Sequence, residues 1–183
     1  MTIPIARGLF RAAIVESGYG WHPYPRLTQR NPDGDPSAET HDVALVRRTG
    51  YDIRTTADLR AIPAQTLMNA FVPDDQSGFI LDGRILTEDL IPAFAADHEA
   101  HVPLLIGSTG FEMATLTSAI ADGWPTSLMS MPERARLLDA YTSDAQPLLH
   151  LLSDAAFRWQ SRELATLHAA HGQPAYILSL IHI

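Results

Sequence analysis

Three short apolar segments most constrain how this chain can fold. They are residues 12–17 (AAIVES), 102–106 (VPLLI) and 175–181 (AYILSLI), and each is bounded by glycine or proline. The last two hardly alternate with polar residues, which is typical of strands that are covered on both faces. The three segments therefore predict the strands of a parallel sheet.

Helical signals fill much of the sequence between these segments. Asp35 and Pro36 offer an N-cap and a first-turn proline to a stretch that ends at Gly50, and Pro63 opens a further turn. Strands that alternate with helices are typical of the α/β class. We therefore expect an α/β fold with parallel central strands and helical insertions.

Two further helices are expected in the last third of the chain. Ser130 and Glu133 have the spacing of a capping box before an apolar stretch. The clearest helical pattern begins at Ser153 and ends at Gly172, because apolar and histidine residues recur at offsets of three and four. This helix leads directly into the last predicted strand.

Composition limits the domain count and the partners. The chain has 183 residues, of which 46% are hydrophobic, and no boundary divides it, so we expect residues 1–183 to form a single domain. Thirteen basic against twenty-one acidic residues leave a net charge of −8 with no basic stripe, which argues against nucleic acid. The absence of cysteine excludes disulfides and thiolate metal sites.

No apolar stretch is long enough for a membrane span, so no membrane partner is expected. The first residues, MTIP, lack the basic and apolar regions of a secretion signal. Any export signal is expected to lie upstream of this chain. The compartment, cytoplasmic or secreted, stays open.

One acidic residue stands out behind the second predicted strand. Glu112 is alone among uncharged residues after a turn that we place at residues 107–111. Ligands and catalytic groups gather at the carboxyl end of parallel strands, and a carboxylate there can orient a histidine that serves a nucleophile. The alternative is an acid that caps a helix start. Spacing alone leaves both interpretations open.

Two histidine pairs have a spacing that one metal ion could bridge. His98 and His101 lie in a polar stretch before a strand, and His168 and His171 lie in the last turn of a predicted helix. Neither pair forms an H-E-x-x-H motif. A solvated helix end explains the first pair and a core-edge or capping role explains the second. A metal protein that uses His98 and His101 remains an alternative.

A long loop is predicted at residues 18–37, which are rich in proline and glycine. Loops of this length are often functional. Trp21 and Tyr24 in this loop either line an apolar substrate pocket or pack the loop onto the rest of the protein. Both interpretations stay open.

Several stretches together resemble the type-B carboxylesterases, the α/β-hydrolase family of para-nitrobenzyl esterases and cholinesterases. They cover nearly the whole chain in the family's order. They are IARGLFRAAIVESG (5–18), LRAIPAQTLMNAFVP (59–73), LDGRIL (81–86), VPLLIGSTGFEMATL (102–116) and SDAAFRWQSRELATLHAAHGQPAYILSL (153–180). The resemblance implies a partial α/β-hydrolase fold and a carboxylic ester hydrolase with a small-molecule ester substrate, without a metal or cofactor in its chemistry.

The resemblance also implies roles for two residues. Glu112 matches the glutamate of the family's Ser-Glu-His triad, and Ser17 matches a serine that supports that glutamate. The sequence departs from the family motif at Thr109, Phe111 and Met113, where the family usually has asparagine, often aspartate, and usually glycine. These departures affect the detailed geometry of the loop around the acid.

The rest of the triad is not expected within these 183 residues. No G-x-S-x-G motif occurs, and the family pattern places it about ten residues before Met1. The family's histidine follows the last strand, and His182 is too close to that strand to be assigned as the base. We therefore expect an internal fragment that carries only the triad acid and is inactive alone.

The missing parts of the fold also affect the partners of this chain. A sheet without its neighbouring strands has an unpaired edge, which favours self-association through that edge.

The alternative function is a non-catalytic, cholinesterase-like domain that uses the same fold for binding or adhesion. The residue at the centre of the upstream G-x-S-x-G position discriminates between the two, because only serine supports the enzyme.

Overall fold

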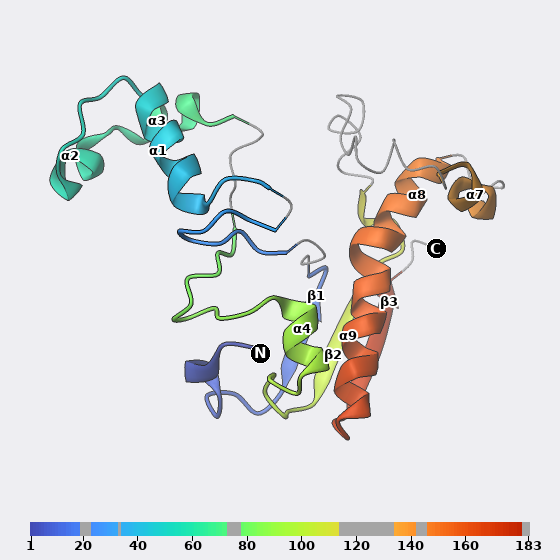
Figure 1. The fold of residues 1–183 in the computed structure, drawn as a ribbon. Coiled ribbons are helices and arrows are strands. Elements are labelled where there is room, and N and C mark those ends of the chain that lie inside the picture. The colour runs from blue at the N-terminus through green and yellow to red at the C-terminus, as the bar shows by residue number, and fades with distance from the viewer. Residues whose placement is uncertain (19–22, 33, 73–77, 114–133, 142–145, 181–183) are drawn as a thin grey trace. The chain divides into compact units, whose positions relative to one another are not determined.

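The computed structural model describes residues 1–18, 23–32, 34–72, 78–113, 134–141 and 146–180 (Figure 1). These residues belong to two compact units, of which the first contains Met1–His22 and Leu90–Ile183 and the second contains Pro23–Asp89. The expected single domain over residues 1–183 stays a prediction. Among the described residues, no helix combines the length and the apolar character that crossing a membrane requires.

The first unit is built on a parallel sheet in the order β1-β2-β3 (Figure 1). The strands are β1 (Ala13–Glu16), β2 (Leu104–Thr109) and β3 (Ala175–Leu180). β2 pairs in parallel with both neighbours. The prediction of three parallel strands is therefore confirmed, and the carboxyl ends of all three lie at one edge of the sheet.

The second strand ends later than its sequence indicates. Gly107 was expected to begin a turn, but β2 continues through it to Thr109, opposite Leu180 of β3. A Cβ atom on Gly107 would lie 1.9 Å from the carbonyl oxygen of Leu178. This glycine is required by the close approach of two strand backbones rather than by a turn, so the placement of the turn at residues 107–111 was wrong.

The other named elements of the described first unit are helical. They are η1 (Pro4–Ala6), α4 (Leu90–Ala95), α7 (Arg134–Leu138), η3 (Asp139–Tyr141), α8 (Pro147–Ser153), η4 (Asp154–Arg158) and α9 (Trp159–Ala170). The capping box predicted at Ser130 and Glu133 lies outside the described residues. The long helix predicted from Ser153 begins earlier, because a proline opens α8 at Pro147 and η4 joins α8 to α9 without a break in helical backbone.

Ser153 lies inside this helical run and bonds other groups instead of capping a helix. Its hydroxyl donates to the carbonyl oxygen of Leu149 at 2.8 Å and accepts from the backbone N–H of Met113 at 3.0 Å. A serine that bonds the preceding turn is compatible with a helix interior. The expected start of the helix at Ser153 was therefore wrong, although its end before Gly172 is confirmed.

One face of the sheet packs against α4 and α9, which lie on the same side of the strands (Figure 1). The buried residues of this core are Phe94, Leu104, Ile106, Leu164 and Ala165. Fully burying a leucine or isoleucine side chain stabilises a fold by about 1.5–3 kcal/mol. These contacts therefore hold the strands that carry the candidate site.

The opposite face of the sheet exposes a row of apolar side chains. Ile14, Leu105 and Tyr176 occupy the same register position on the three strands. Ile14 is 68% exposed and Tyr176 is 60% exposed. Because paired residues of neighbouring strands project from the same face, these side chains form one continuous apolar row.

The second unit contains α1 (Ala38–Arg48), α2 (Thr56–Ala61) and α3 (Ala64–Ala70). Ser37, rather than the expected Asp35, is the N-cap of α1, and its hydroxyl accepts a hydrogen bond from the N–H of Thr40. Pro63 precedes the first residue of α3, as its turn signal predicted. The helix α2 begins with a capping box between Thr55 and Asp58.

The close approach at Gly107 predicts a specific sensitivity of the sheet. Gly107→Ala should reduce the free energy of unfolding by about 3 kcal/mol or more, because a methyl group would collide with the backbone of Leu178. Urea unfolding followed by circular dichroism measures this loss. Gly172→Asn is the matched control, since Gly172 has a φ of 78° in open space and asparagine tolerates that conformation. Equal stability of both variants would contradict the role of Gly107.

Candidate active site at the carboxyl edge of the sheet

Glu112 lies three residues beyond the last residue of β2. The strand fixes the start of this segment, since Gly110 donates its N–H to the carbonyl oxygen of Leu180 on β3. Ligands and catalytic groups gather at this edge in parallel α/β sheets. The predicted position of Glu112 at the carboxyl edge of the sheet is therefore observed.

Two donors hold one oxygen of the Glu112 carboxylate. The backbone N–H of Thr109 donates to Oε1 at 2.6 Å, and the Ser17 hydroxyl donates to the same oxygen. Hydrogen bonds to an ionised carboxylate are stronger than those between neutral groups. The first donor is a backbone group, so the departure from the family motif at Thr109 leaves this bond intact.

Ser17 reaches Glu112 from the neighbouring strand. Its N–H donates to the carbonyl oxygen of Gly107 at 2.8 Å and so extends the pairing of β1 with β2 by one step. Its φ of 54° is uncommon for a residue other than glycine. The structure thus brings together the two residues that the sequence assigned to this site, 95 positions apart.

The residues on either side of Glu112 anchor it to a second apolar core. Met113 is 1% exposed and packs with Leu149, Leu151 and Leu152. Phe111 packs against the same cluster, and its ring centroid lies 4.4 Å from that of His150. Both positions depart from the family motif, and in this chain both fix the acid between two packed side chains. Sequence reasoning treated them as departures and missed this anchoring role.

The structure describes only one of the two aromatic residues, Trp21 and Tyr24, for which a substrate pocket or a packing role was left open. Trp21 lies outside the described residues. Tyr24 is partly buried within the second unit, where its ring packs edge-on against Phe79 and its N–H donates to Asp89 Oδ1 at 2.6 Å. Burial, assisted by the Asp89 charge, raises the pKa of the Tyr24 hydroxyl. These contacts favour the packing interpretation for Tyr24.

The histidines that the sequence singled out lie before β2 and β3, at the amino edge of the sheet. Neither His98 nor His101 belongs to the group of three possible metal ligands that the described residues bring together, and their use by a metal protein stays a prediction. The described residues instead bring Asp97 and Glu99 close to His171 of the other pair. His168 is fully buried and bonds Glu99, as the predicted core-edge role implies. Sequence reasoning missed this grouping because its members come from distant segments.

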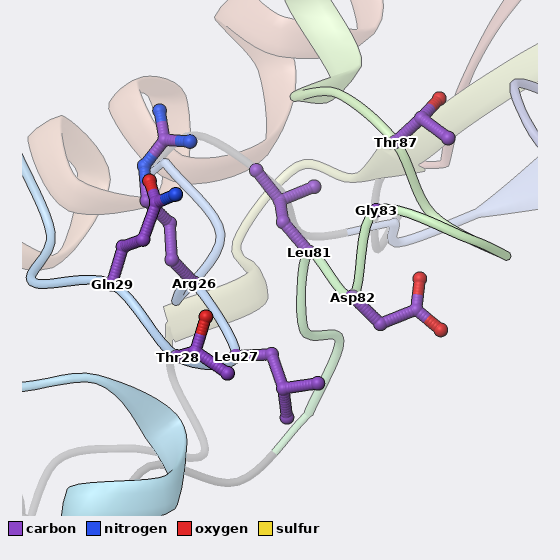
Figure 2. Close-up of a pocket in the computed structure, with 8 residues that line it drawn as sticks. All are labelled: Arg26, Leu27, Thr28, Gln29, Leu81, Asp82, Gly83 and Thr87. Carbon is purple, nitrogen blue, oxygen red and sulfur yellow. The ribbon is translucent and has the colours of Figure 1, made fainter.

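A small pocket of about 200 Å³ lies in the second unit and is formed by two chain segments (Figure 2). Its lining residues are Arg26, Leu27, Thr28, Gln29, Leu81, Asp82, Gly83 and Thr87. The only carboxylate among them belongs to Asp82, and it accepts hydrogen bonds from the N–H groups of Arg84, Ile85 and Leu86. This carboxylate stabilises a turn, so the pocket does not offer an available acid for catalysis.

Comparisons with known proteins support the family resemblance. No family model matches the chain. The chain is 24% identical over 195 residues to the para-nitrobenzyl esterase of Bacillus subtilis (strain 168). This match covers 97% of the chain and 38% of that esterase. Its structure resembles carboxylesterase EST55 of Geobacillus stearothermophilus at pH 6.2, with a TM-score of 0.74 and 25% identity over 100% of this chain and 40% of EST55.

A second similar structure is EstA of Aspergillus niger, with a TM-score of 0.64 and 21% identity over 91% of this chain and 36% of EstA. The chain therefore spans about two fifths of the length of the proteins it matches. It is similar in sequence and structure to part of the type-B carboxylesterases, and its parallel sheet with helices is part of an α/β-hydrolase fold. The predicted resemblance and fold class are confirmed.

The hydrogen bonds to Asp82 predict a pH-dependent contribution to stability. These bonds hold the pKa of the Asp82 carboxyl below its ordinary value, so its contribution is present above about pH 4 and is lost as the pH falls through the lowered pKa. Asp82→Ala should therefore lower the melting temperature at pH 7 more than in acid.

Thermal unfolding at several pH values measures this difference. Asp52→Ala is the control, because the Asp52–Arg54 pair is highly exposed and such pairs contribute little. An equal effect of Asp82→Ala at every pH would contradict the assignment.

Proposed function

We propose that this chain supplies the acid of a Ser-Glu-His triad to a carboxylic ester hydrolase. In this proposal Glu112 is the triad acid and Ser17 is a positioning residue. The observation that carries the proposal is the hydrogen bond of the Ser17 hydroxyl to the Glu112 carboxylate at the carboxyl edge of the sheet. The similarity to para-nitrobenzyl esterase and to carboxylesterases supports the reaction class.

The proposed chemistry follows the triad mechanism. A serine hydroxyl attacks the ester carbonyl, and a histidine accepts its proton and later returns one to the leaving alcohol. Water then hydrolyses the acyl-enzyme and releases the acid. The carboxylate of Glu112 orients the histidine and stabilises it when it is positively charged. Formation and hydrolysis of the acyl-enzyme by this mechanism require no metal or cofactor.

The residues around Glu112 suit this role because they limit its movement. The Thr109 N–H and the Ser17 hydroxyl fix Oε1, and the buried side chain of Met113 fixes the following residue. A catalytic group must be held within about 0.5 Å of its productive position. Backbone pairing, a side-chain bond and core packing together provide that restraint.

The proposal assigns the nucleophile and the histidine to segments that the relatives have beyond the matched part. The printed sequence contains no G-x-S-x-G motif. The exposed apolar row of Ile14, Leu105 and Tyr176 supports this assignment, because a parallel sheet is normally covered on both faces. Further protein on that face would cover the row. Self-association through the unpaired edge of the sheet stays a separate prediction.

The first test places the chain in a complete esterase. A chimera in which these 183 residues replace the matching segment of the Bacillus subtilis para-nitrobenzyl esterase should hydrolyse p-nitrophenyl esters. In it, Glu112→Gln should reduce kcat by about 10³–10⁴-fold, because the charge and the control of the histidine tautomer are lost. The melting temperature should change little.

Glu16→Gln is the matched control, since Glu16 is an exposed glutamate at the end of β1. It should leave kcat unchanged. Ser17→Ala should reduce kcat less than Glu112→Gln, because Glu112 keeps its charge and the hydrogen bond from the Thr109 N–H. A folded chimera that hydrolyses no ester, or a Glu112→Gln variant of normal activity, would contradict the proposal and favour a non-catalytic binding domain.

A second test concerns the chain by itself. The purified 183-residue chain should not hydrolyse p-nitrophenyl acetate faster than a denatured sample, because its sequence lacks the nucleophile motif. Stopped assays over a range of substrate concentrations measure this rate. Saturable turnover that persists through purification would show that the chain uses a different set of catalytic residues.

A further inference from the structure

A second group of polar side chains lies at the amino edge of the sheet, away from Glu112. Asp97 and Glu99 belong to the segment before β2, and His171 follows α9 in the segment before β3. Their nearest ligand atoms all lie within 4.8 Å of one another. The six residues of β2 separate this edge from the other by roughly 17–20 Å of strand. The group is therefore independent of the proposed triad acid.

The spacing of these atoms matches the coordination shell of a small transition-metal ion. His171 Nδ1 lies 3.2 Å from Asp97 Oδ1 and 3.5 Å from Glu99 Oε1. Two ligands bound tetrahedrally to zinc at their usual bond lengths are separated by about 3.4 Å. One imidazole and two carboxylates are ligand types that zinc accepts. We propose that Asp97, Glu99 and His171 bind a zinc ion.

Burial of Glu99 provides a second, independent observation. This residue is 2% exposed, and its Oε2 atom has no hydrogen-bond partner among the described residues. A buried carboxylate oxygen without a partner is unfavourable, since burial removes its bonds to water. The other oxygen, Oε1, lies 2.8 Å from His168 Nδ1 and 3.5 Å from His171 Nδ1, so the carboxylate lies beside the group. A metal ion bound by this carboxylate would compensate for the lost hydration.

His168 holds the Glu99 carboxylate in this orientation. Its Nε2 lies 2.8 Å from the carbonyl oxygen of Val102 and its Nδ1 lies 2.8 Å from Glu99 Oε1. These two contacts hold the ring of His168 between the Val102 carbonyl and the Glu99 carboxylate. Bonds of this kind orient ligating carboxylates in metal sites. Glu99 Oε1 is thereby fixed, and the carboxylate is already placed for binding.

The surroundings also favour a positive ion. Two carboxylates lie in the group, and His171 is the C-cap residue of α9, where the helix dipole favours positive charge. The side chain of Asp97 is 45% exposed, so an ion can enter from solvent. Outside the group, His101 Nε2 lies 2.8 Å from Asp97 Oδ1 and helps to hold this carboxylate in place.

Zinc at this position would have a structural effect. It would join the segment before β2 to the end of α9, two parts of the chain that are 74 positions apart in the case of Asp97 and His171 (171 − 97). Binding to the folded state alone stabilises a protein, and the stabilisation grows with the logarithm of the ligand concentration once that concentration exceeds Kd. The proposed site therefore stabilises the amino edge of the sheet and has no role in ester hydrolysis.

The test measures zinc binding and stability of the 183-residue chain. After dialysis against EDTA, titration calorimetry should show one zinc ion per chain, and zinc should raise the melting temperature. Calcium and magnesium, which prefer all-oxygen sites, should do neither. Circular dichroism before titration shows that the metal-free chain is folded. A folded chain that binds no zinc would show that the group is only a set of ion pairs and would overturn the proposal.

Variants identify the ligands. Asp97→Asn should weaken zinc binding by about tenfold or more and should keep the fold, because asparagine tolerates the φ of 62° at this position. His171→Ala should have a similar effect on zinc affinity. His98→Ala is the matched control, since this exposed histidine lies outside the group. Unchanged affinity in Asp97→Asn, or an equal loss in His98→Ala, would show that the ion binds elsewhere.

Discussion

The pairing of β2 with a strand on each side is the interaction on which the rest of the first unit depends. Because β1 and β3 both run parallel to β2, the ends of all three strands align at two edges. Gly107 permits this pairing, since any larger residue would collide with the backbone of β3. Ser17 and Glu112 meet only because the strands that precede them are hydrogen-bonded neighbours.

The two edges of the sheet hold polar groups of different kinds. At the carboxyl edge a single carboxylate is held by a hydroxyl and a backbone N–H, in an arrangement suited to orienting another group. At the amino edge, carboxylates and histidines are bonded to one another around a buried glutamate. The first arrangement is the basis of the proposed catalytic role, whereas the second is the basis of the proposed metal site.

Several features followed from local sequence because they arise within a few residues. Short apolar segments between glycines and prolines marked all three strands, and the lone acid behind the second strand marked Glu112. Other features depended on partners from elsewhere in the chain. Gly107 resembled a turn residue until β3 was placed beside it, and Ser153 resembled a helix start because its contact with Met113 joins residues 40 positions apart.

The sequence by itself determined the class of fold, the resemblance to carboxylesterases and the identity of the candidate acid, because hydrophobic period and motif order are properties of the linear chain. Only the tertiary structure decided what surrounds each polar group. It showed that Phe111 and Met113 anchor the acid and that Glu99 is buried between histidines. The physical reason is that burial and hydrogen bonding depend on which distant segments pack together, and spacing along the chain does not encode those distances.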